Sequence, residues 1–188
     1  VASTYKRGID LIHVPTTLLA MVDSSIGGKN GINNTFGKNM IGTFYQPKHI
    51  LIFPYFLKTL PKEEIINGMA EIIKTAAIGN IKLWNTLQSY CLDDLLNDDQ
   101  LFQDIIQETA FTKLSIVEND FLDKAGSSKI TIKYPRELLN FGHTIGHVIE
   151  YATQKKHGYC VAIGMVKELL FKKNGNHLVP LEIQNEII

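Results

Sequence analysis

LLNFGHTIGHVIE, residues 138–150, is the stretch that decides how the second half of this chain folds. At about 100° per residue, the apolar side chains around Ile145 gather on one face of a helix. The opposite face then carries five polar side chains: Arg136, Asn140, His143, His147 and Glu150. Gly142 and Gly146 flank this face, and they are tolerable in a helix where another backbone or a ligand approaches closely. The pattern predicts one helix over 137–153, with a buried apolar stripe and a polar face unlike a merely solvated one.

Three histidines in this region could take part in metal binding. His143 and His147 are four residues apart, a spacing that lets two imidazoles converge on one metal ion. His157 stands before an apolar helical segment, and a chain reversal would bring it back over His143, so the metal-binding pair stays open. A carboxylate is the usual third ligand. Glu71 is a candidate, although it lies about 140° from the apolar stripe of its own helix, which alone predicts a solvated side chain. Lys74 shares that face, as an ion-pair partner or as a cation near the reacting group.

The pattern of apolar residues changes near Pro61 and divides the chain into two parts. Residues 1–61 hold short apolar segments, at 11–14 and 50–53, that predict strands between Gly-rich turns. From residue 63 onward apolar side chains recur at three- and four-residue spacings. Helices are therefore expected from residue 63 and then near 83–96, 100–118, 137–153 and 160–173. We predict an α/β remnant over 1–61, followed by a mostly α-helical domain over 62–188.

Composition limits the classes of protein. The 188 residues are 45% apolar and 20% charged, which excludes a disordered chain. Lys plus Arg and Asp plus Glu both number 19, so no overall field favours nucleic acid or an anionic membrane as a partner. Cys91 and Cys160 lack metal-ligand spacing, and no apolar run approaches the roughly 18 residues of a membrane span. We expect a cytoplasmic protein. Because it opens at Val1 rather than Met, we also expect a piece of a longer chain.

Two Gly-Lys stretches in the first part could bind an anion. In residues 27–29 and 37–39, glycines stand beside lysines, so that backbone amides and ammonium groups can surround a phosphate. A Walker motif is excluded, because Asp23 stands where its first glycine should be and Asn30 where its Ser or Thr should be. An irregular anion-binding loop and an ordinary hairpin both remain open.

Several blocks of sequence, in this order along the chain, resemble the 3-dehydroquinate synthase family, most closely the synthase domain of fungal pentafunctional arom polypeptides. The blocks are ASTYKRG (2–8), PTTLLAMVDSSIGGK (15–29), GKNMIGTF (37–44), INGMAEIIKTAAI (66–78), LLNFGHTIGHVIE (138–150) and VAIGMVKE (161–168). The resemblance implies a dehydroquinate synthase-like fold. In that fold, residues 1–61 are the end of an NAD-binding α/β domain that is largely missing here. Residues 62–188 are then a helical metal- and substrate-binding domain, incomplete at its C-terminus.

The resemblance also implies a function. The family converts 3-deoxy-D-arabino-heptulosonate 7-phosphate to 3-dehydroquinate and phosphate in the shikimate pathway, as a lyase that uses NAD and a divalent metal, zinc or cobalt. The implied metal ligands are Glu71, His143 and His157, with His147, Lys74 and Lys29 as catalytic groups. The implied substrate-binding residues are Arg7, Asp23, Lys29, Asn39, Lys74, Lys113, Arg136 and Asn140. The implied cofactor-binding residues are Thr16, Thr17, Lys38, Phe56 and Thr59.

The implied assembly is a homodimer, because Arg7 matches an arginine that reaches the partner subunit's site. Further shikimate-pathway domains would follow along the same chain, and we expect activity only in the intact parent. The sequence departs from the family at four positions: Asn30, Phe53, Tyr159 and Ile132. Ile132 replaces a family Glu within an apparent insertion, 121–135, and Glu118 and Asp120 are candidate substitutes. Two other functions stay open: a metal-dependent alcohol or glycerol dehydrogenase, and a degenerate non-catalytic domain.

Overall fold

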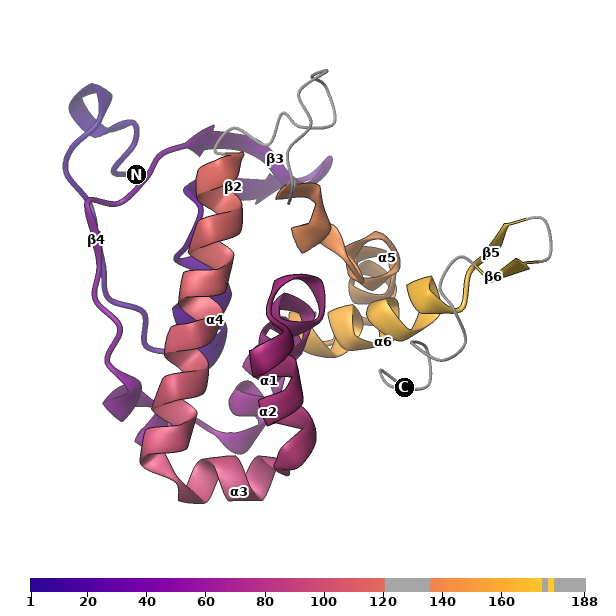
Figure 1. Ribbon diagram of the computed structural model, residues 1–188. Coiled ribbons are helices and arrows are strands. Elements are labelled where there is room, and N and C mark those ends of the chain that lie inside the picture. The colour runs from indigo at the N-terminus through magenta and orange to yellow at the C-terminus, as the bar shows by residue number, and fades with distance from the viewer. Residues whose placement is uncertain (121–135, 174–175, 178–188) are drawn as a thin grey trace.

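The first part of the chain forms short strands and helical turns in the computed structural model, which describes residues 1–120, 136–173 and 176–177 (Figure 1). β1 (Ile12–His13) pairs in parallel with β4 (His49–Ile50). Both strands are shorter than the expected 11–14 and 50–53. Proline lacks the amide hydrogen that a strand ladder needs, and Pro15 and Pro54 follow closely. The same part of the chain holds three helical turns: η1 (Tyr5–Arg7), η2 (Ala20–Ser24) and η3 (Pro54–Thr59).

The two Gly-Lys stretches belong to one antiparallel hairpin. β2 (Lys29–Asn34) pairs with β3 (Gly37–Phe44), with a shift of register between Ile32 and Asn34. At the turn, the side-chain oxygen of Asn34 accepts hydrogen bonds from the amides of Phe36 (2.8 Å) and Gly37 (3.2 Å). Asn favours such turns because its side chain can bond the backbone two residues on. Of the two alternatives open from the sequence, the hairpin is the one that forms.

The remaining elements are mostly helices. They are α1 (Lys62–Gly79), α2 (Ile81–Ser89), α3 (Leu92–Asn97), α4 (Asp99–Asn119), η5 (Arg136–Asn140), α5 (His143–Thr153) and α6 (His157–Leu169), with short strands β5 (Lys172–Lys173) and β6 (Asn176–His177). The single helix expected near 83–96 is two helices. Tyr90 and Cys91 have extended backbones between them, and the Asp94 carboxylate caps α3 by accepting from the Cys91 amide at 2.9 Å.

The main hydrophobic core lies where α1, α4 and η2 meet. Leu18, Met21 and Val22 come from the η2 segment and are fully buried. They form one cluster with apolar residues of α1 to α4: Ile65, Ile72, Ala76, Leu83, Leu95, Phe102, Ile105 and Ile106. α1 packs against α4 within this core and against α6 on another side. This double packing places α1 inside the molecule, and it decides where the charged residues of α1 lie.

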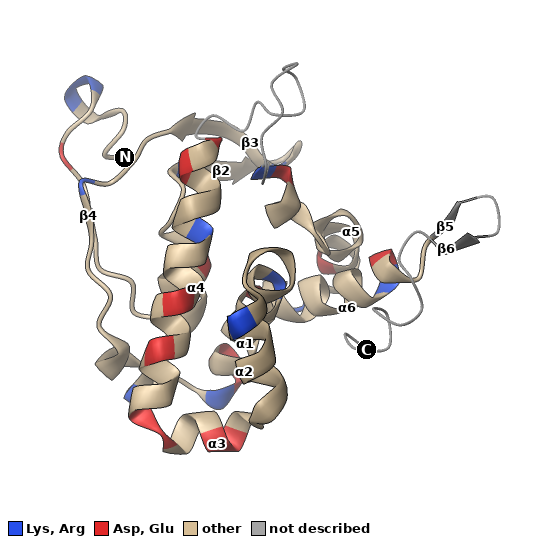
Figure 2. Cartoon of the chain, in the orientation of Figure 1, with Lys and Arg blue, Asp and Glu red and all other residues tan. Residues whose placement is uncertain are grey.

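Acidic side chains gather on α3 and α4, as Figure 2 shows. Two of them pair with lysines from neighbouring segments: Asp93 with Lys62 at 2.6 Å, and Asp99 with Lys58 at 2.9 Å. All four side chains are more than half exposed, so these pairs contribute little stability and mark a solvated surface. Within the described part of the chain, every helix is too short or too polar to cross a bilayer.

Candidate metal centre

The motif LLNFGHTIGHVIE does not form one helix. η5 ends at Asn140, Gly142 adopts a left-handed backbone (φ 79°), and α5 begins at His143. The prediction of a continuous helix over 137–153 was therefore wrong. Its physical reason is contact with α6: a side chain at Gly142 would lie 2.7 Å from the carbonyl oxygen of Val161. Glu168 of α6 then caps the new helix, accepting from the amides of Gly142 (2.7 Å) and Ile145 (3.3 Å).

The buried face of α5 is also different from the one predicted. Val148, expected in the apolar stripe, is 67% exposed, whereas Gly146 is buried. A Cβ on Gly146 would lie 3.1 Å from the carbonyl oxygen of Cys160 on α6. The close backbone approach expected at Gly142 and Gly146 is thus confirmed. α6 covers the glycine side of α5, and on the rest of this helix His143 is half-buried while His147 and Val148 are exposed.

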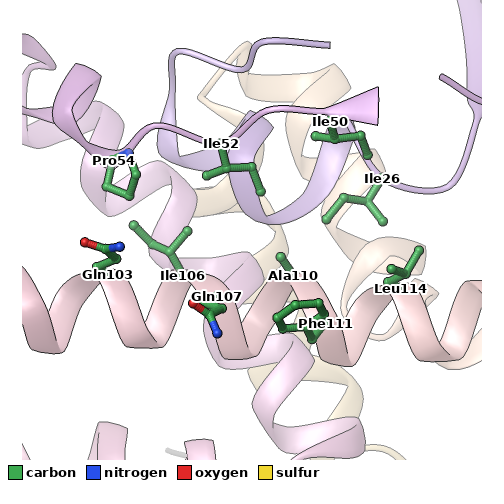
Figure 3. Close-up of a pocket in the computed structure, with 10 residues that line it drawn as sticks. All are labelled: Ile26, Ile50, Ile52, Pro54, Gln103, Ile106, Gln107, Ala110, Phe111 and Leu114. Atoms are coloured by element: carbon green, nitrogen blue, oxygen red, sulfur yellow. The ribbon is translucent and has the colours of Figure 1, made fainter. Parts of the chain in front are cut away.

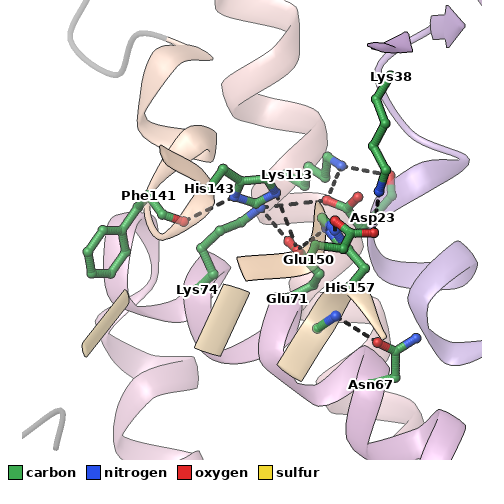
Figure 4. A network of polar contacts seen from close by, with 11 residues as sticks. Asp23, Lys38, Asn67, Glu71, Lys74, Lys113, Phe141, His143, Glu150 and His157 are labelled. Carbon is green, nitrogen blue, oxygen red and sulfur yellow. Dashed lines mark hydrogen bonds and ion pairs between the residues drawn. The ribbon is translucent and has the colours of Figure 1, made fainter. Parts of the chain in front are cut away.

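Three potential metal ligands converge from α1, α5 and α6 (Figure 4). The expected chain reversal brings the His157 ring to 5.2 Å from the His143 ring. Oε1 of Glu71 lies 3.3 Å from Nε2 of His157 and 3.7 Å from Nε2 of His143, and each pair of ligand atoms in this trio is within 4.8 Å. Tetrahedral zinc with bonds of about 2.05 Å separates its ligand atoms by about 3.3 Å. The trio is close to that spacing.

Glu71 is fully buried, so its predicted solvated position was wrong. The helical pattern failed because α6 covers the side of α1 that points away from the main core. Neither carboxylate oxygen of Glu71 receives a hydrogen bond, although Lys74 forms an ion pair with it. Lys74 pairs with Oε2 of Glu71, so Oε1, which is buried and faces two imidazole nitrogens, is the oxygen that a bound cation would complete. Two His and one Glu are also the donor set of many catalytic zinc sites, so these residues fit a divalent metal.

The histidines differ in protonation. Burial lowers the pKa of His143, with a further contribution from the Lys74 ammonium. Burial also lowers the pKa of His147, whose ring lies 5.2 Å from the His143 ring. The adjacent Glu71 carboxylate, 3.3 Å from Nε2, raises the pKa of His157, and Glu150 adds to this effect. His143 and His147 are therefore neutral near pH 7, the form in which imidazole binds a metal or accepts a proton.

A string of alternating charges continues from the three ligands into the protein. The Lys74 ammonium lies 3.8 Å from Oδ1 of Asp23, and Lys113 pairs with the same carboxylate and donates to the Asp23 carbonyl at 2.7 Å. Both lysines are buried. Burial alone would raise the pKa of Asp23, but the two lysines hold it well below its usual range. Burial lowers the pKa of Lys113. The structure thus brings together Asp23, Lys74 and Lys113, all expected near substrate.

Other expected substrate residues lie around this network. Arg136 is buried in η5 and donates to the Gly27 carbonyl at 2.7 Å, which joins η5 to the start of the hairpin. Asn140 is exposed at the end of η5. Lys29 and Asn39 are exposed on the hairpin, and Lys38 reaches α5 to pair with Glu150. Ile132 lies outside the described residues. Of its two candidate substitutes, Asp120 is buried and Glu118 is exposed.

The expected cofactor residues belong to the N-terminal segments. Thr16 is exposed, and Thr17 accepts from the Ala20 amide at 3.2 Å to begin η2. Phe56 and Thr59 are exposed in η3, where the Thr59 hydroxyl donates to the Phe56 carbonyl at 3.3 Å. Arg7 is exposed in η1. These side chains belong to η1, η3 and the segment before η2, whereas the network of Figure 4 lies between the hairpin and the helices.

Sequence reasoning gave no role to three residues that shape the centre. Glu150 accepts from Nδ1 of His157 at 3.2 Å. Asn67 accepts from the Gly158 amide at 2.7 Å and so joins α1 to the start of α6. Glu168 caps α5, as described above. Only Glu150 carried a signal, since it shares a helix face with His143 and His147. The other two depend on helix packing that no local pattern records.

A separate groove of about 270 Å³ lies between residues 50–54 and α4 (Figure 3). Its walls are apolar apart from two glutamines: Ile26, Ile50, Ile52, Pro54, Gln103, Ile106, Gln107, Ala110, Phe111 and Leu114. None of these side chains ionises or ligates a metal. The groove therefore offers binding surface but no acid, base or metal ligand, and the chemistry belongs to the network of Figure 4.

Comparison with known protein families identifies the family to which this chain belongs. Residues 1–67 match the family model described as 3-dehydroquinate synthase N-terminal, and residues 68–187 match the one described as 3-dehydroquinate synthase C-terminal. The chain belongs to the 3-dehydroquinate synthase family. The two matched regions meet at residues 67 and 68, inside α1.

Curated relatives of this synthase-family chain include single-activity and fused proteins. A 3-dehydroquinate synthase of Lactococcus lactis subsp. cremoris (strain SK11) is 46% identical over 191 residues, covering 100% of this chain and 51% of the relative. The pentafunctional AROM polypeptide of Clavispora lusitaniae is 42% identical over 97% of this chain and 12% of its own length. The chain thus spans about half the length of the single-activity relative.

Solved structures confirm the dehydroquinate synthase-like fold. ValA, a 2-epi-5-epi-valiolone synthase from Streptomyces hygroscopicus subsp. jinggangensis with NAD+ and Zn2+ bound, aligns with a TM-score of 0.75 and 27% identity, over 90% of this chain and 46% of ValA. A 2-deoxy-scyllo-inosose synthase in complex with carbaglucose-6-phosphate, NAD+ and Co2+ aligns with a TM-score of 0.72 and 32% identity, over 88% of this chain and 43% of that protein.

Proposed function

We propose that the whole protein is a 3-dehydroquinate synthase, which converts 3-deoxy-D-arabino-heptulosonate 7-phosphate to 3-dehydroquinate and phosphate. The observation that carries this proposal is the convergence of Glu71, His143 and His157 beside a buried string of charges. Relatives of that name, at 46% identity along the whole chain, support it. Because the chain spans about half of such a relative, the activity is proposed for the whole protein.

The proposed cofactors are NAD and a divalent metal, zinc or cobalt. When bound, NAD accepts a hydride from the substrate and returns it, and the metal polarises a substrate hydroxyl. Glu71, His143 and His157 would hold the metal. Thr16, Thr17, Lys38, Phe56 and Thr59 are proposed to contact NAD. Solved relatives with NAD+ and Zn2+ or Co2+ bound support both assignments.

Side chains of this chain would position the substrate and neutralise its negative charges. A substrate with a carboxylate and a phosphate needs several cations. We propose that Arg7, Lys29, Lys74, Lys113 and Arg136 supply them, assisted by Asn39 and Asn140. Lys74 and Lys113 are held in place by Asp23 and Glu71, so they need little reorganisation when an anion arrives. His147, neutral and exposed, would accept a proton or contact the phosphate.

The assembly proposed for the whole protein is a homodimer, with Arg7 reaching the partner subunit's site. Its exposed position in η1 supports this role, and size-exclusion chromatography with light scattering would test it. Further shikimate-pathway domains on the same chain are a second proposal, supported by the fused relative from Clavispora lusitaniae. We retain the proposed division into an α/β part, 1–61, and a helical part, 62–188.

One experiment tests the proposed function directly. The whole protein, with NAD and zinc, should release phosphate from the heptulosonate phosphate, and His143→Ala should abolish that release. Analysis of the products separates the two alternatives. Net accumulation of NADH would identify a dehydrogenase, because a synthase returns its hydride in each turnover. Absence of both phosphate release and bound zinc would identify a non-catalytic domain and refute the proposal.

A further inference from the structure

We infer that Glu150 is a positioning residue of the metal centre: it accepts the Nδ1 hydrogen of His157 and so directs Nε2 of that ring toward Glu71. This inference rests on the proposed function, since it concerns the geometry of the proposed metal ligands. Glu150 is not itself among those ligands. It acts through His157, from the neighbouring helix α5.

The His157 ring lies between two carboxylates. Its Nε2 is 3.3 Å from Oε1 of Glu71, and its Nδ1 is 3.2 Å from Oε2 of Glu150. An ionised carboxylate can only accept a hydrogen bond. When the lone pair of Nε2 is used for a metal, the single proton of the neutral ring sits on Nδ1, where Glu150 accepts it. The contact with Glu150 selects this tautomer and fixes the ring plane.

His143 is held in the same way by a different acceptor. Its Nδ1 lies 3.2 Å from the carbonyl oxygen of Phe141, and its Nε2 faces Oε1 of Glu71 at 3.7 Å. Both rings thus pair Nδ1 with an oxygen and present Nε2 to the same carboxylate oxygen. For His143 the acceptor comes from the turn just before it. For His157, the first residue of α6, the acceptor comes from a side chain on α5.

Lys38 completes the arrangement from the hairpin. Its ammonium pairs with Oε1 of Glu150, the oxygen that does not contact His157, as Figure 4 shows. The two oxygens of Glu150 therefore connect β3 to the first turn of α6.

A competing use of Glu150 is direct metal ligation. Ligand atoms of His147, Glu150 and His157 also lie within 4.8 Å of one another. A metal in that group would need Nδ1 of His157, which would have to lose its proton while Nε2 binds the first metal. The Lys38 ammonium already pairs with Oε1 of Glu150, and this positive charge beside the carboxylate favours the positioning role over a second cation there. The inference therefore requires one metal ion per chain.

The experiment compares Glu150→Ala, Glu150→Gln and the parent full chain. Asp93→Asn is the matched control, because it breaks another lysine–carboxylate pair on the exposed surface. Long-range 1H–15N NMR of metal-free protein reports the tautomer of His157, recorded at increasing pH until the ring is neutral, because the two carboxylates raise its pKa. Zinc affinity is measured against a competing chelator, and the number of metal ions per chain by elemental analysis. Circular dichroism checks that each variant is folded.

We expect Glu150→Ala to shift the His157 proton toward Nε2 and to weaken zinc binding by roughly 10- to 100-fold, the usual effect of losing such a partner. Glu150→Gln keeps an accepting oxygen and should lose less, and Asp93→Asn should match the parent. The inference would be overturned if Glu150→Ala kept the tautomer and the zinc affinity of the parent. It would also be overturned if the parent bound two metal ions per chain and Glu150→Ala bound one. A parent that binds no metal refutes the proposed function, and with it the metal part of this inference. The tautomer then shows separately whether Glu150 orients His157.

Discussion

Replacement of Gly158 by alanine would place a methyl group at the point where α1 and α6 touch. Gly158 lies in the first turn of α6, directly after His157, and its amide donates to Oδ1 of Asn67 at 2.7 Å. A Cβ on Gly158 would lie 1.9 Å from the backbone oxygen of Asn67. Heavy atoms in contact need about 3.5 Å, so the start of α6 has to retreat by roughly 1.6 Å.

Two costs follow from this displacement. Strain from the added methyl group costs about 1–3 kcal/mol in a packed interior. Loss of the buried hydrogen bond between Gly158 and Asn67 costs about 1–3 kcal/mol more. Alanine's higher helix propensity returns about 1 kcal/mol. The free energy of unfolding should therefore fall by about 1–5 kcal/mol. Zinc affinity should also fall, because His157 moves with α6 while metal–ligand distances tolerate only about 0.2 Å.

Urea unfolding and zinc titration measure the two effects on the same samples. Gly79→Ala is the matched control, since its Cβ would meet only side-chain methyl groups of Ile116 and Thr112, at 3.3 Å. These can move, and alanine favours the helix, so this variant should be neutral or slightly more stable than the parent. The reasoning is refuted if Gly158→Ala matches the parent in both free energy of unfolding and zinc affinity.

Three further predictions concern other contacts. Asn80 caps α2 by accepting from the Leu83 amide at 3.0 Å, so Asn80→Ala should lower the free energy of unfolding by about 0.5–2 kcal/mol in urea; an unchanged midpoint would contradict this. Asp23, with its lowered pKa, contributes stability that is complete above the unfolded pKa of about 3.9 and is lost as pH falls from there toward the folded pKa. Asp23→Asn should flatten stability-versus-pH curves in that window, and an equally steep curve would exclude the contribution. Zinc at 100 times its dissociation constant should add about 2.7 kcal/mol to the free energy of unfolding. This should appear as a rise in Tm that a chelator reverses and that Glu71→Gln abolishes. An unchanged Tm when zinc is added to the parent would count against the site.

Sequence periodicity predicted those elements whose shape is set locally. The helix expected near 100–118 is α4, at Asp99–Asn119, and its start is fixed by Asp98, which accepts from the amides of Gln100 and Leu101. In the described residues, β1 to β4 come before α1 and most of the helices follow it. Such elements need only their own side-chain pattern and a cap.

The candidate centre could not be placed by periodicity, because it depends on contacts between elements. The angular argument assumed that residues 138–150 form one helix, but Gly142 breaks it with a left-handed backbone. Glu71 seemed solvated because its helix has one apolar stripe, yet α6 covers another side of that helix. Long-range packing decided both cases, and neither signal is present in the local sequence.

The glycines of this region explain how three distant side chains reach one point. A Cβ at Gly164 would lie 1.9 Å from the carbonyl oxygen of Gly142, and one at Gly146 would lie 3.1 Å from that of Cys160, so α5 and α6 touch backbone to backbone. Gly158 makes the corresponding contact with α1. An imidazole extends only a few ångströms from its backbone, so His143 and His157 can both reach Glu71 only if all three helices are this close. The spacing of glycines is therefore as much a part of the candidate metal centre as the spacing of histidines. A search for this centre in other sequences should require both.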